Sequence, residues 1–209
     1  MIKLISQILA DKLGKSLQVS NNDIAIYTYA LEILLGAIFK IVIILAFSAA
    51  LGIFYTCLVF ISIFFLFRWL GGGVHLDSYW GCVLFGIILV TTMGRISQIK
   101  TPLFLLLILF LVTALFSFLV CIIWVPGGTD KKPIGNPLDR KKQKIETLLA
   151  WGLWVSVVVI CLSHYLFTVS LAAILAVFWS SFFVTPIGYR SIGMIDQLYS
   201  NIKGGAEHV

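Results

Sequence analysis

Six long apolar segments dominate this chain and leave it few ways to fold. They cover approximately residues 33–51, 53–70, 79–94, 102–125, 146–163 and 166–187. A helix needs ~20 predominantly apolar residues, with a range of ~17–25, to cross the hydrocarbon core of a bilayer. Because lipid offers no hydrogen-bond partners, such segments must satisfy their backbone groups internally, as helices do. The pattern therefore predicts an all-α integral membrane protein with about six transmembrane helices.

The composition agrees with this prediction. Of the 209 residues, 60% are hydrophobic and only 11% are charged, too few charges to cover the surface of a soluble domain. Two of the spans can be short or re-entrant, and the third in particular is short and begins at a polar cluster. The first two segments join at Leu51–Gly52 without a polar turn. One long kinked helix is the alternative for that first pair. We predict a single polytopic domain over residues 1–209.

The N-terminal segment, residues 1–22, has a different pattern. Its apolar side chains repeat at helical spacing while the lysines fall elsewhere: Ile2, Ile5, Leu9 and Leu13. Such a pattern is typical of an amphipathic helix that lies in the membrane interface. The following "SNND" at 20–23 offers a cap for the next helix.

The basic residues predict the topology. Residues 125–145 carry six of them against two aspartates: Lys131, Lys132, Arg140, Lys141, Lys142 and Lys144. Lys and Arg accumulate in cytoplasmic loops, so this loop is predicted to be cytoplasmic. Counting helices from it places both termini, residues 68–78 and a tail at 188–209 on the same side. This scheme places Arg95 and Lys100 on the external side of the membrane, which is evidence against it.

The net charge of +6 mainly reflects topology and contact with the lipid bilayer. Aromatic residues do not alternate with the basic ones as they do in many nucleic-acid-binding segments, so we predict no nucleic-acid partner. The basic loop is most simply an anchor to anionic lipid.

A polar cluster stands out from this background in the stretch "FRWLGGGVHLDSYWGC", residues 67–82. Among the three histidines, only His75 shares a predicted membrane face with a cysteine near the surface, Cys82. A cysteine becomes a strong nucleophile when a neighbouring imidazole takes its proton. The two residues are therefore candidates for a catalytic pair with His75 as general base and Cys82 as nucleophile.

The spacing of the pair sets a geometric condition. Seven residues along one helix separate two side chains by about 10.5 Å, which is too far for proton transfer. We therefore predict that Gly71–Gly73 form a bend that returns His75 over the start of the next helix, which Asp77 or Ser78 would cap. A metal site of His75, Asp77 and Cys82 is less favoured because a further ligand is needed. We predict no cofactor. The alternative that His75 and Cys82 are chemically inert residues of an ordinary loop stays open.

These residues resemble a known family, the accessory gene regulator B (AgrB-like) membrane peptidases. The family pattern is an Arg, then Gly-x-His, then a Cys seven residues after the His, here Arg68, Gly73-Val74-His75 and Cys82. The Pro-flanked basic loop at 125–144 is a second match. The resemblance covers nearly the whole chain in length and hydropathy.

The resemblance implies a function in quorum sensing at the bacterial cell membrane. Such proteins cut a short precursor peptide on the C-terminal side of the future ring, through a thioester at the cysteine, and promote closure of a thiolactone or lactone. The resemblance also favours a homodimer. The alternative is a membrane peptide exporter or carrier in which Cys82 has no chemical role.

Several other residues have candidate supporting roles. Arg68 could snorkel to the surface, hold a substrate carboxylate or fix the loop, and Asp77 could orient His75. Ser78 could donate to an oxyanion. Glu32, a charge in or near the first apolar segment, could face the active site or pair with Lys40. Lys131 and Lys132 could capture an acidic precursor tail.

Overall fold

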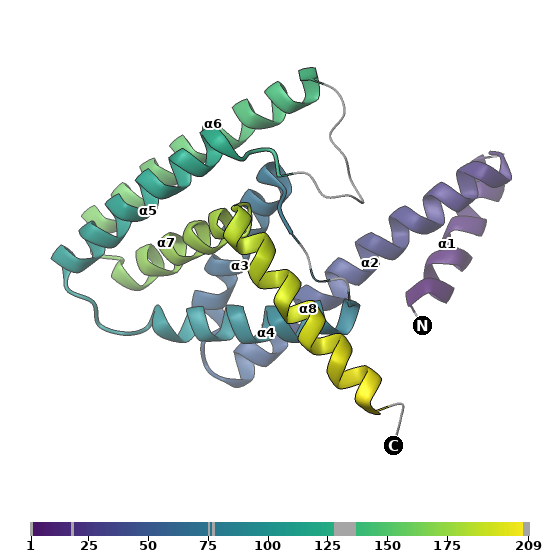
Figure 1. The fold of residues 1–209 in the computed structure, drawn as a ribbon, viewed down its shortest axis with the longest axis horizontal. Coiled ribbons are helices and arrows are strands. Elements are labelled where there is room, and N and C mark those ends of the chain that lie inside the picture. Colours follow the sequence, from purple (N-terminus) through teal and green to yellow (C-terminus); the bar gives the residue numbers. More distant parts are fainter. Residues whose placement is uncertain (1, 18, 75, 77, 128–136, 207–209) are drawn as a thin grey trace. The chain divides into compact units, whose positions relative to one another are not determined.

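The computed structural model describes residues 2–17, 19–74, 76, 78–127 and 137–206, and every regular element in this part of the chain is an α-helix. The eight helices are α1 (Ile2–Leu17), α2 (Asn21–Ala50), α3 (Phe54–Gly71), α4 (Tyr79–Ile96), α5 (Leu103–Ile123), α6 (Pro137–Ser163), α7 (Phe167–Phe182) and α8 (Pro186–Ala206) (Figure 1). The chain forms two compact units, Met1–Phe47 and Ser48–Val209. The predicted all-α membrane architecture is confirmed.

The first unit consists of α1 and most of α2. Ser20 caps α2 as the sequence predicts: its hydroxyl accepts a hydrogen bond from the Asp23 amide, and the Asp23 carboxylate accepts one from the Ser20 amide (3.3 and 3.1 Å). This reciprocal pair satisfies backbone donors that a helix N-terminus leaves open. In α1, Ile5, Leu9 and Leu13 are exposed. The predicted helix is thus present, and its place in the membrane interface stays a prediction.

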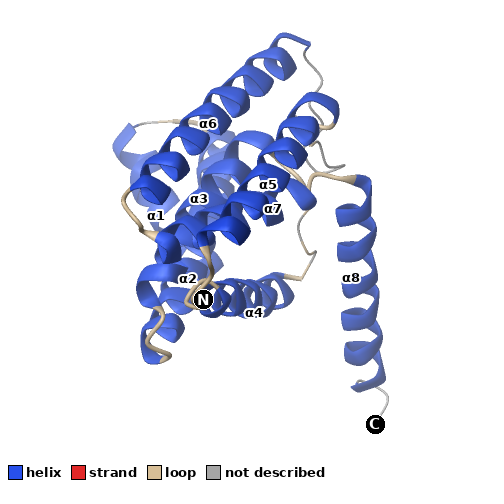
Figure 2. Ribbon diagram, turned by 90° about the vertical axis from the view of Figure 1, so that its left-hand side faces the viewer, coloured by secondary structure: helices blue, strands red, loops and turns tan. Residues whose placement is uncertain are grey.

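The second unit is organised around α7, which packs against α3, α4, α5 and α6 (Figure 2). Small side chains line much of α7 and are buried: Ser170, Ala172, Ala173, Ala176, Ser180 and Ser181. Because the hydrophobic effect does not drive helices together within lipid, close packing of small residues is a main source of helix association there. The composition of α7 therefore explains its central position.

Two indole groups tie α6 to its neighbours. Trp154 donates a hydrogen bond from Nε1 to the Ala173 carbonyl of α7 (3.2 Å), and Trp151 donates to the Ser117 hydroxyl of α5 (3.0 Å). Both bonds satisfy polar groups that would otherwise face an apolar interior. These tryptophans therefore have structural roles in helix packing.

Leu106 of α5 is fully buried in the core shared by α3, α5, α6 and α7. We expect Leu106→Ala to destabilise the protein by on the order of 2 kcal/mol, because the cavity removes packing contacts that lipid cannot replace. Thermal unfolding in detergent would measure the loss. The neighbouring Leu105 is 44% exposed, so Leu105→Ala is the control and should change the melting temperature little. Equal losses in the two variants would contradict the assigned core.

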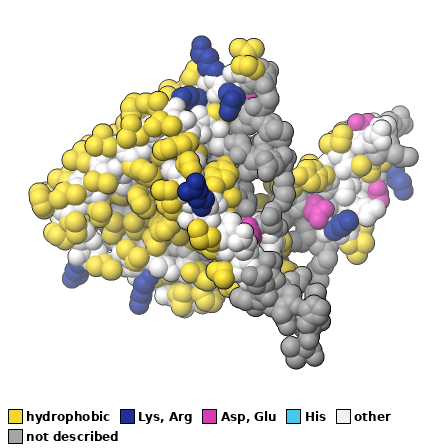
Figure 3. Space-filling model, viewed as in Figure 1, with side chains coloured by type: hydrophobic (Ala, Val, Ile, Leu, Met, Phe, Trp, Pro, Cys, Tyr) yellow, Lys and Arg dark blue, Asp and Glu magenta, His cyan; other side chains and the backbone are white. Residues whose placement is uncertain are grey.

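Five helices, α2 to α6, are long and apolar enough to cross a membrane, and α7 with α8 makes a sixth candidate. Hydrophobic side chains cover most of the visible face formed by α5 and α6 (Figure 3). The first two apolar segments form separate helices, α2 and α3, divided by a turn in which Gly52 has φ of +70°. One kinked helix, the alternative for this pair, is not what the structure contains. The protein is a multi-pass membrane protein.

The last apolar segment differs from the prediction of one span over 166–187. Helix α7 ends at Phe182, and α8 leaves at 82° to it (Figure 2). Pro186 explains the break, since proline disfavours a helical conformation in the residue before it and lacks an N–H. Thr185 then caps α8 by accepting a hydrogen bond from the Gly188 amide (3.2 Å). Much of the predicted tail at 188–209 is consequently helical.

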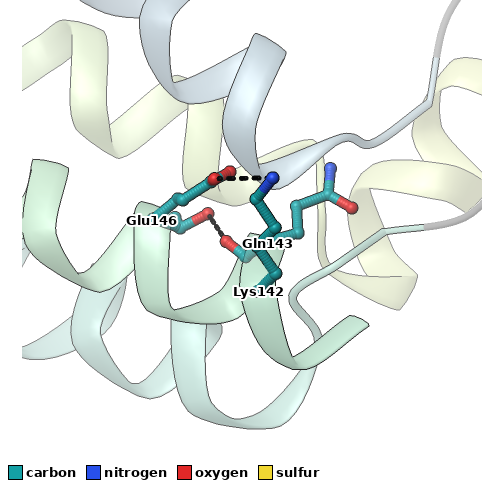
Figure 4. A network of polar contacts seen from close by, with 4 residues as sticks. Lys142, Gln143 and Glu146 are labelled. Atoms are coloured by element: carbon teal, nitrogen blue, oxygen red, sulfur yellow. Dashed lines mark hydrogen bonds and ion pairs between the residues drawn. The ribbon is translucent and has the colours of Figure 1, made fainter. Parts of the chain in front are cut away.

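The second half of the predicted basic loop is also helical, because α6 begins at Pro137 rather than after residue 145. Proline fits the first turn of a helix, and the following Lys, Arg and Gln residues are good helix formers. Lys142 and Glu146 form an exposed i,i+4 ion pair there (3.9 Å; Figure 4). Lys144 donates from Nζ to the Ile122 carbonyl near the end of α5. The basic residues of early α6 therefore lie at the same end of the bundle as the C-terminus of α5.

Candidate functional site

Two loops far apart in sequence meet beside the C-terminal end of α3. The Gly73 amide donates to the Gly127 carbonyl (3.1 Å), and the Gly127 amide donates to the Gly71 carbonyl (2.8 Å). The Val74 amide donates to the Phe183 carbonyl between α7 and α8 (3.3 Å). The connections after α3, α5 and α7 therefore form one backbone assembly. This places the polar loop after α3 at the same end of the bundle as the loop after α5, as the predicted topology requires.

Glycine is needed at two positions of this assembly. Gly72 and Gly73 have φ of +76° and +113°, which side-chain-bearing residues rarely adopt. A Cβ at Gly72 would collide with the Gly127 carbonyl, and one at Gly73 would lie 2.9 Å from the Phe183 carbonyl and collide with Arg68 Nη1. The glycine run therefore permits both the bend and the close approach of the second loop.

Arg68, in the last turn of α3, directs its guanidinium at this loop. Its Nη2 donates a hydrogen bond to the Val74 carbonyl, and its Cζ lies 5.9 Å from the centre of the Phe183 ring, within cation–π range. Its Nη1 is buried, and none of the groups that the structure describes accepts a hydrogen bond from it. An incompletely bonded buried charge is costly and calls for an explanation beyond loop anchoring.

Cys82 lies in the first turns of α4, as predicted, and is half-buried. Ser78 caps this helix: its hydroxyl accepts a hydrogen bond from the Gly81 amide (3.3 Å), and its carbonyl accepts one from the Cys82 amide (2.9 Å). The described residues between α3 and α4 are not helical. Helix α4 therefore does not extend back through Leu76, and the return of His75 over its start stays a prediction, since His75 lies outside the described residues.

Phe183 connects the start of α4 with Arg68. Its ring packs edge-on against Phe85 of α4 (5.8 Å between centroids) and Phe64 of α3 (6.2 Å). Phe85 is three residues after Cys82, and residues at that spacing lie on neighbouring parts of one helix face. Through Phe183, the start of α4 with Cys82 and the buried guanidinium of Arg68 therefore lie at the same end of the bundle.

Several predicted site residues cannot be placed. His75, Asp77, Lys131 and Lys132 lie outside the described residues. Glu32 lies in α2 within the first unit, so its position facing the active site stays a prediction. Among the described residues no group of three or more His, Cys, Asp or Glu side chains could hold a metal ion.

Sequence reasoning missed the residues that complete the site from other segments: Gly127, Phe183 and Tyr189. A Cβ at Gly127 would lie 3.2 Å from the Tyr189 hydroxyl oxygen, so the phenol reaches the second loop. The signal in the sequence is Thr185-Pro186-Ile187-Gly188, whose proline breaks the helix inside the apolar segment that is predicted as one span over 166–187.

The sequence model of one family, Accessory gene regulator B (AgrB), matches residues 6–184. The chain belongs to the AgrB family. This confirms the resemblance drawn from Arg68, Gly73, His75 and Cys82, and the matched range includes all of these residues while ending before α8.

Two relatives of this AgrB family member come from Clostridium perfringens and carry the name AgrB-like protein. One, from strain 13, is 25% identical over 215 residues, covering 97% of this chain and 100% of the relative. The other, from strain SM101, is 25% identical over 213 residues with the same coverage. No solved structure gives a significant match.

Proposed function

We propose that this protein is a membrane-embedded cysteine endopeptidase that matures a short precursor peptide into a cyclic quorum-sensing signal. The observation that carries the proposal is the position of Cys82, half-buried at the capped start of α4 and at the same end of the bundle as the buried guanidinium of Arg68. Membership of the AgrB family supports the same role. The proposed location is the bacterial cell membrane, with both termini and this site on the cytoplasmic side.

The first chemical step is an acyl transfer to Cys82. His75 takes the thiol proton, and the sulfur attacks the carbonyl carbon of the scissile peptide bond. The C–N bond then breaks, and the C-terminal fragment leaves as an amine that receives the proton from the imidazolium. The N-terminal part of the precursor remains as a thioester on Cys82.

The second step closes the ring. A Cys or Ser side chain within the precursor attacks the thioester carbonyl, and the Cys82 sulfur leaves and recovers a proton. Exchange of one thioester for another is nearly balanced in free energy. The thioester on Cys82 must therefore be protected from hydrolysis until the ring closes. The site at the end of the helical bundle helps to exclude water from it. Because a thioester is less stable than an amide, departure of the tail or product must draw the reaction forward.

The basic connection between α5 and α6 suits capture of the precursor. Lys131 and Lys132 are proposed to bind an acidic precursor tail, and the hydrogen bonds of Gly127 join this connection to the loop before Cys82. Binding there would bring the scissile bond towards the thiol. We also propose that the protein acts as a homodimer in the bilayer.

Trapping of the acyl intermediate tests the proposal. Purified protein mixed with precursor and quenched in acid should gain the mass of the N-terminal precursor fragment less one water on Cys82, and hydroxylamine should release the acyl group. The final product should be lighter than the linear fragment by one water. Cys161→Ala, which changes a cysteine at the other end of the bundle, should leave both results intact. Cleavage without any hydroxylamine-sensitive adduct would contradict a thioester mechanism.

A further inference from the structure

Helix α8 carries an apolar stripe that the bundle leaves uncovered. Ile187, Met194 and Leu198 share one face of the helix by their spacing, and they are 65%, 60% and 63% exposed. Ser191 lies on the same face, and its hydroxyl donates a hydrogen bond to the Ile187 carbonyl (2.9 Å). Because this hydroxyl is satisfied within the helix, it does not prevent the stripe from entering an apolar environment.

Part of the same apolar face is buried in the protein. Ile192 is 3% exposed, and Ile195, which lies between it and the stripe around the helix, is half-buried. Gly188 approaches the end of α7 so closely that a Cβ there would collide with the Phe182 carbonyl. Arg190 and Gly193 are exposed outside this face. The helix is thus amphipathic, and its apolar face is wider than its contact with the bundle.

The direction of α8 relative to the membrane follows from the break at Pro186. Helix α7 has 16 residues and is therefore about 24 Å long, most of the ~30 Å thickness of the hydrocarbon core. It packs against α3, α5 and α6, which are each apolar enough to cross a membrane. Because α8 leaves α7 at 82°, it runs along the plane of the bilayer and not through it (Figure 2).

Helix α8 also begins at the end of the bundle where lipid headgroups are expected. It starts three residues after Phe183, whose carbonyl joins the loop assembly through Val74. Exposed basic side chains of early α6 lie at this same end: Arg140, Lys141 and Lys142. Such a cluster attracts anionic headgroups. Within the described residues, α8 is not one of the helices that are apolar enough to cross a membrane alone.

We infer that α8 lies in the membrane interface beside the loop assembly, with Ile187, Met194 and Leu198 inserted among phospholipid acyl chains. Arg190 then lies towards the headgroups and water, as in other interfacial amphipathic helices. A stripe of three side chains is too small for the roughly 800 Å² that each partner buries in a stable protein interface, so lipid is the fitting occupant. Anchored in this way, α8 holds the junction between Phe183 and Val74 at a fixed depth in the membrane.

Site-specific photocrosslinking tests this placement in the full-length protein. Met194 or Leu198 is replaced with p-benzoylphenylalanine, and the protein is reconstituted in vesicles of phosphatidylcholine and phosphatidylglycerol. On illumination the benzophenone carbonyl carbon bonds to a nearby carbon atom, and the hydrogen of that C–H bond moves to the ketone oxygen. The labelled peptide should therefore gain the whole mass of one phospholipid, and fragmentation should locate the bond on an acyl chain.

Gly193 is the matched control position, because it adjoins Met194 in sequence, is exposed on another face and has open space where a Cβ would lie. The same label there should give a several-fold lower yield of acyl-chain adduct. The two stripe positions are independent measurements, so a variant with a lowered melting temperature can be set aside in favour of the other.

The crosslinking requires no precursor, so its result is independent of the cysteine chemistry proposed above. Equal yields of lipid adduct at all three positions would contradict an oriented interfacial helix. A covalent dimer without lipid adduct at Met194 and Leu198 would show that a second copy of the chain covers the stripe. Absence of any adduct at both stripe positions would show that the stripe faces water, and each of these results would overturn the inference.

Discussion

Cys82→Ala is expected to abolish precursor cleavage, with a loss on the order of 10⁴-fold or more, because no other atom can form the covalent intermediate. His75→Ala should cause a loss of similar scale by removing the base that makes the thiolate. The measurement is the rate of precursor disappearance and of cyclic product formation, followed by mass spectrometry with purified protein in lipid vesicles.

The double variant sharpens this expectation. Residues that act as one catalytic unit are strongly non-additive, so Cys82→Ala combined with His75→Ala should lose no more activity than either change alone. Iodoacetamide should inactivate the wild-type protein and Cys161→Ala alike. Survival of cleavage in Cys82→Ala or His75→Ala would instead favour a peptide carrier in which this thiol is incidental.

Gly73→Ala is expected to have the second largest effect. The backbone at Gly73 has φ of +113°, and an added Cβ would lie 2.9 Å from the Phe183 carbonyl and collide with Arg68. Holding a side-chain-bearing residue in such a conformation costs roughly 1–3 kcal/mol before any collision is counted. The loop must therefore move, and small displacements of catalytic groups can cost about 10²-fold in rate. We expect a lower melting temperature and at least that loss of cleavage.

Gly193→Ala is the control for this substitution. Gly193 lies in α8 with no positive φ, and no atom lies within 4 Å of the place that its Cβ would occupy. The change should leave cleavage intact and should not lower the stability, because Ala favours a helix interior over Gly by up to about 1 kcal/mol. Wild-type stability and cleavage in Gly73→Ala would show that the contacts between Gly73, Arg68 and Phe183 do not support the site.

Local signals predicted much of the fold. Apolar runs identified the helices because lipid forces each spanning segment to satisfy its own backbone. The helix caps at Ser20 and Ser78 can be predicted from the sequence because capping depends on residues only three positions apart. The break before Pro186 and the start of α6 at Pro137 differ from the prediction, because hydropathy and charge do not report the backbone constraints that proline imposes.

The sequence by itself determined that this is a multi-pass helical protein of the AgrB type with Cys82 at a helix start, because hydropathy, capping and short motifs act over a few residues. The tertiary structure decided what surrounds Arg68. Its contact with Phe183, the pairing of Gly73 with Gly127 and the approach of Tyr189 to Gly127 join segments that are remote along the chain. Such contacts depend on how α3, α5 and α7 pack, which no local pattern specifies.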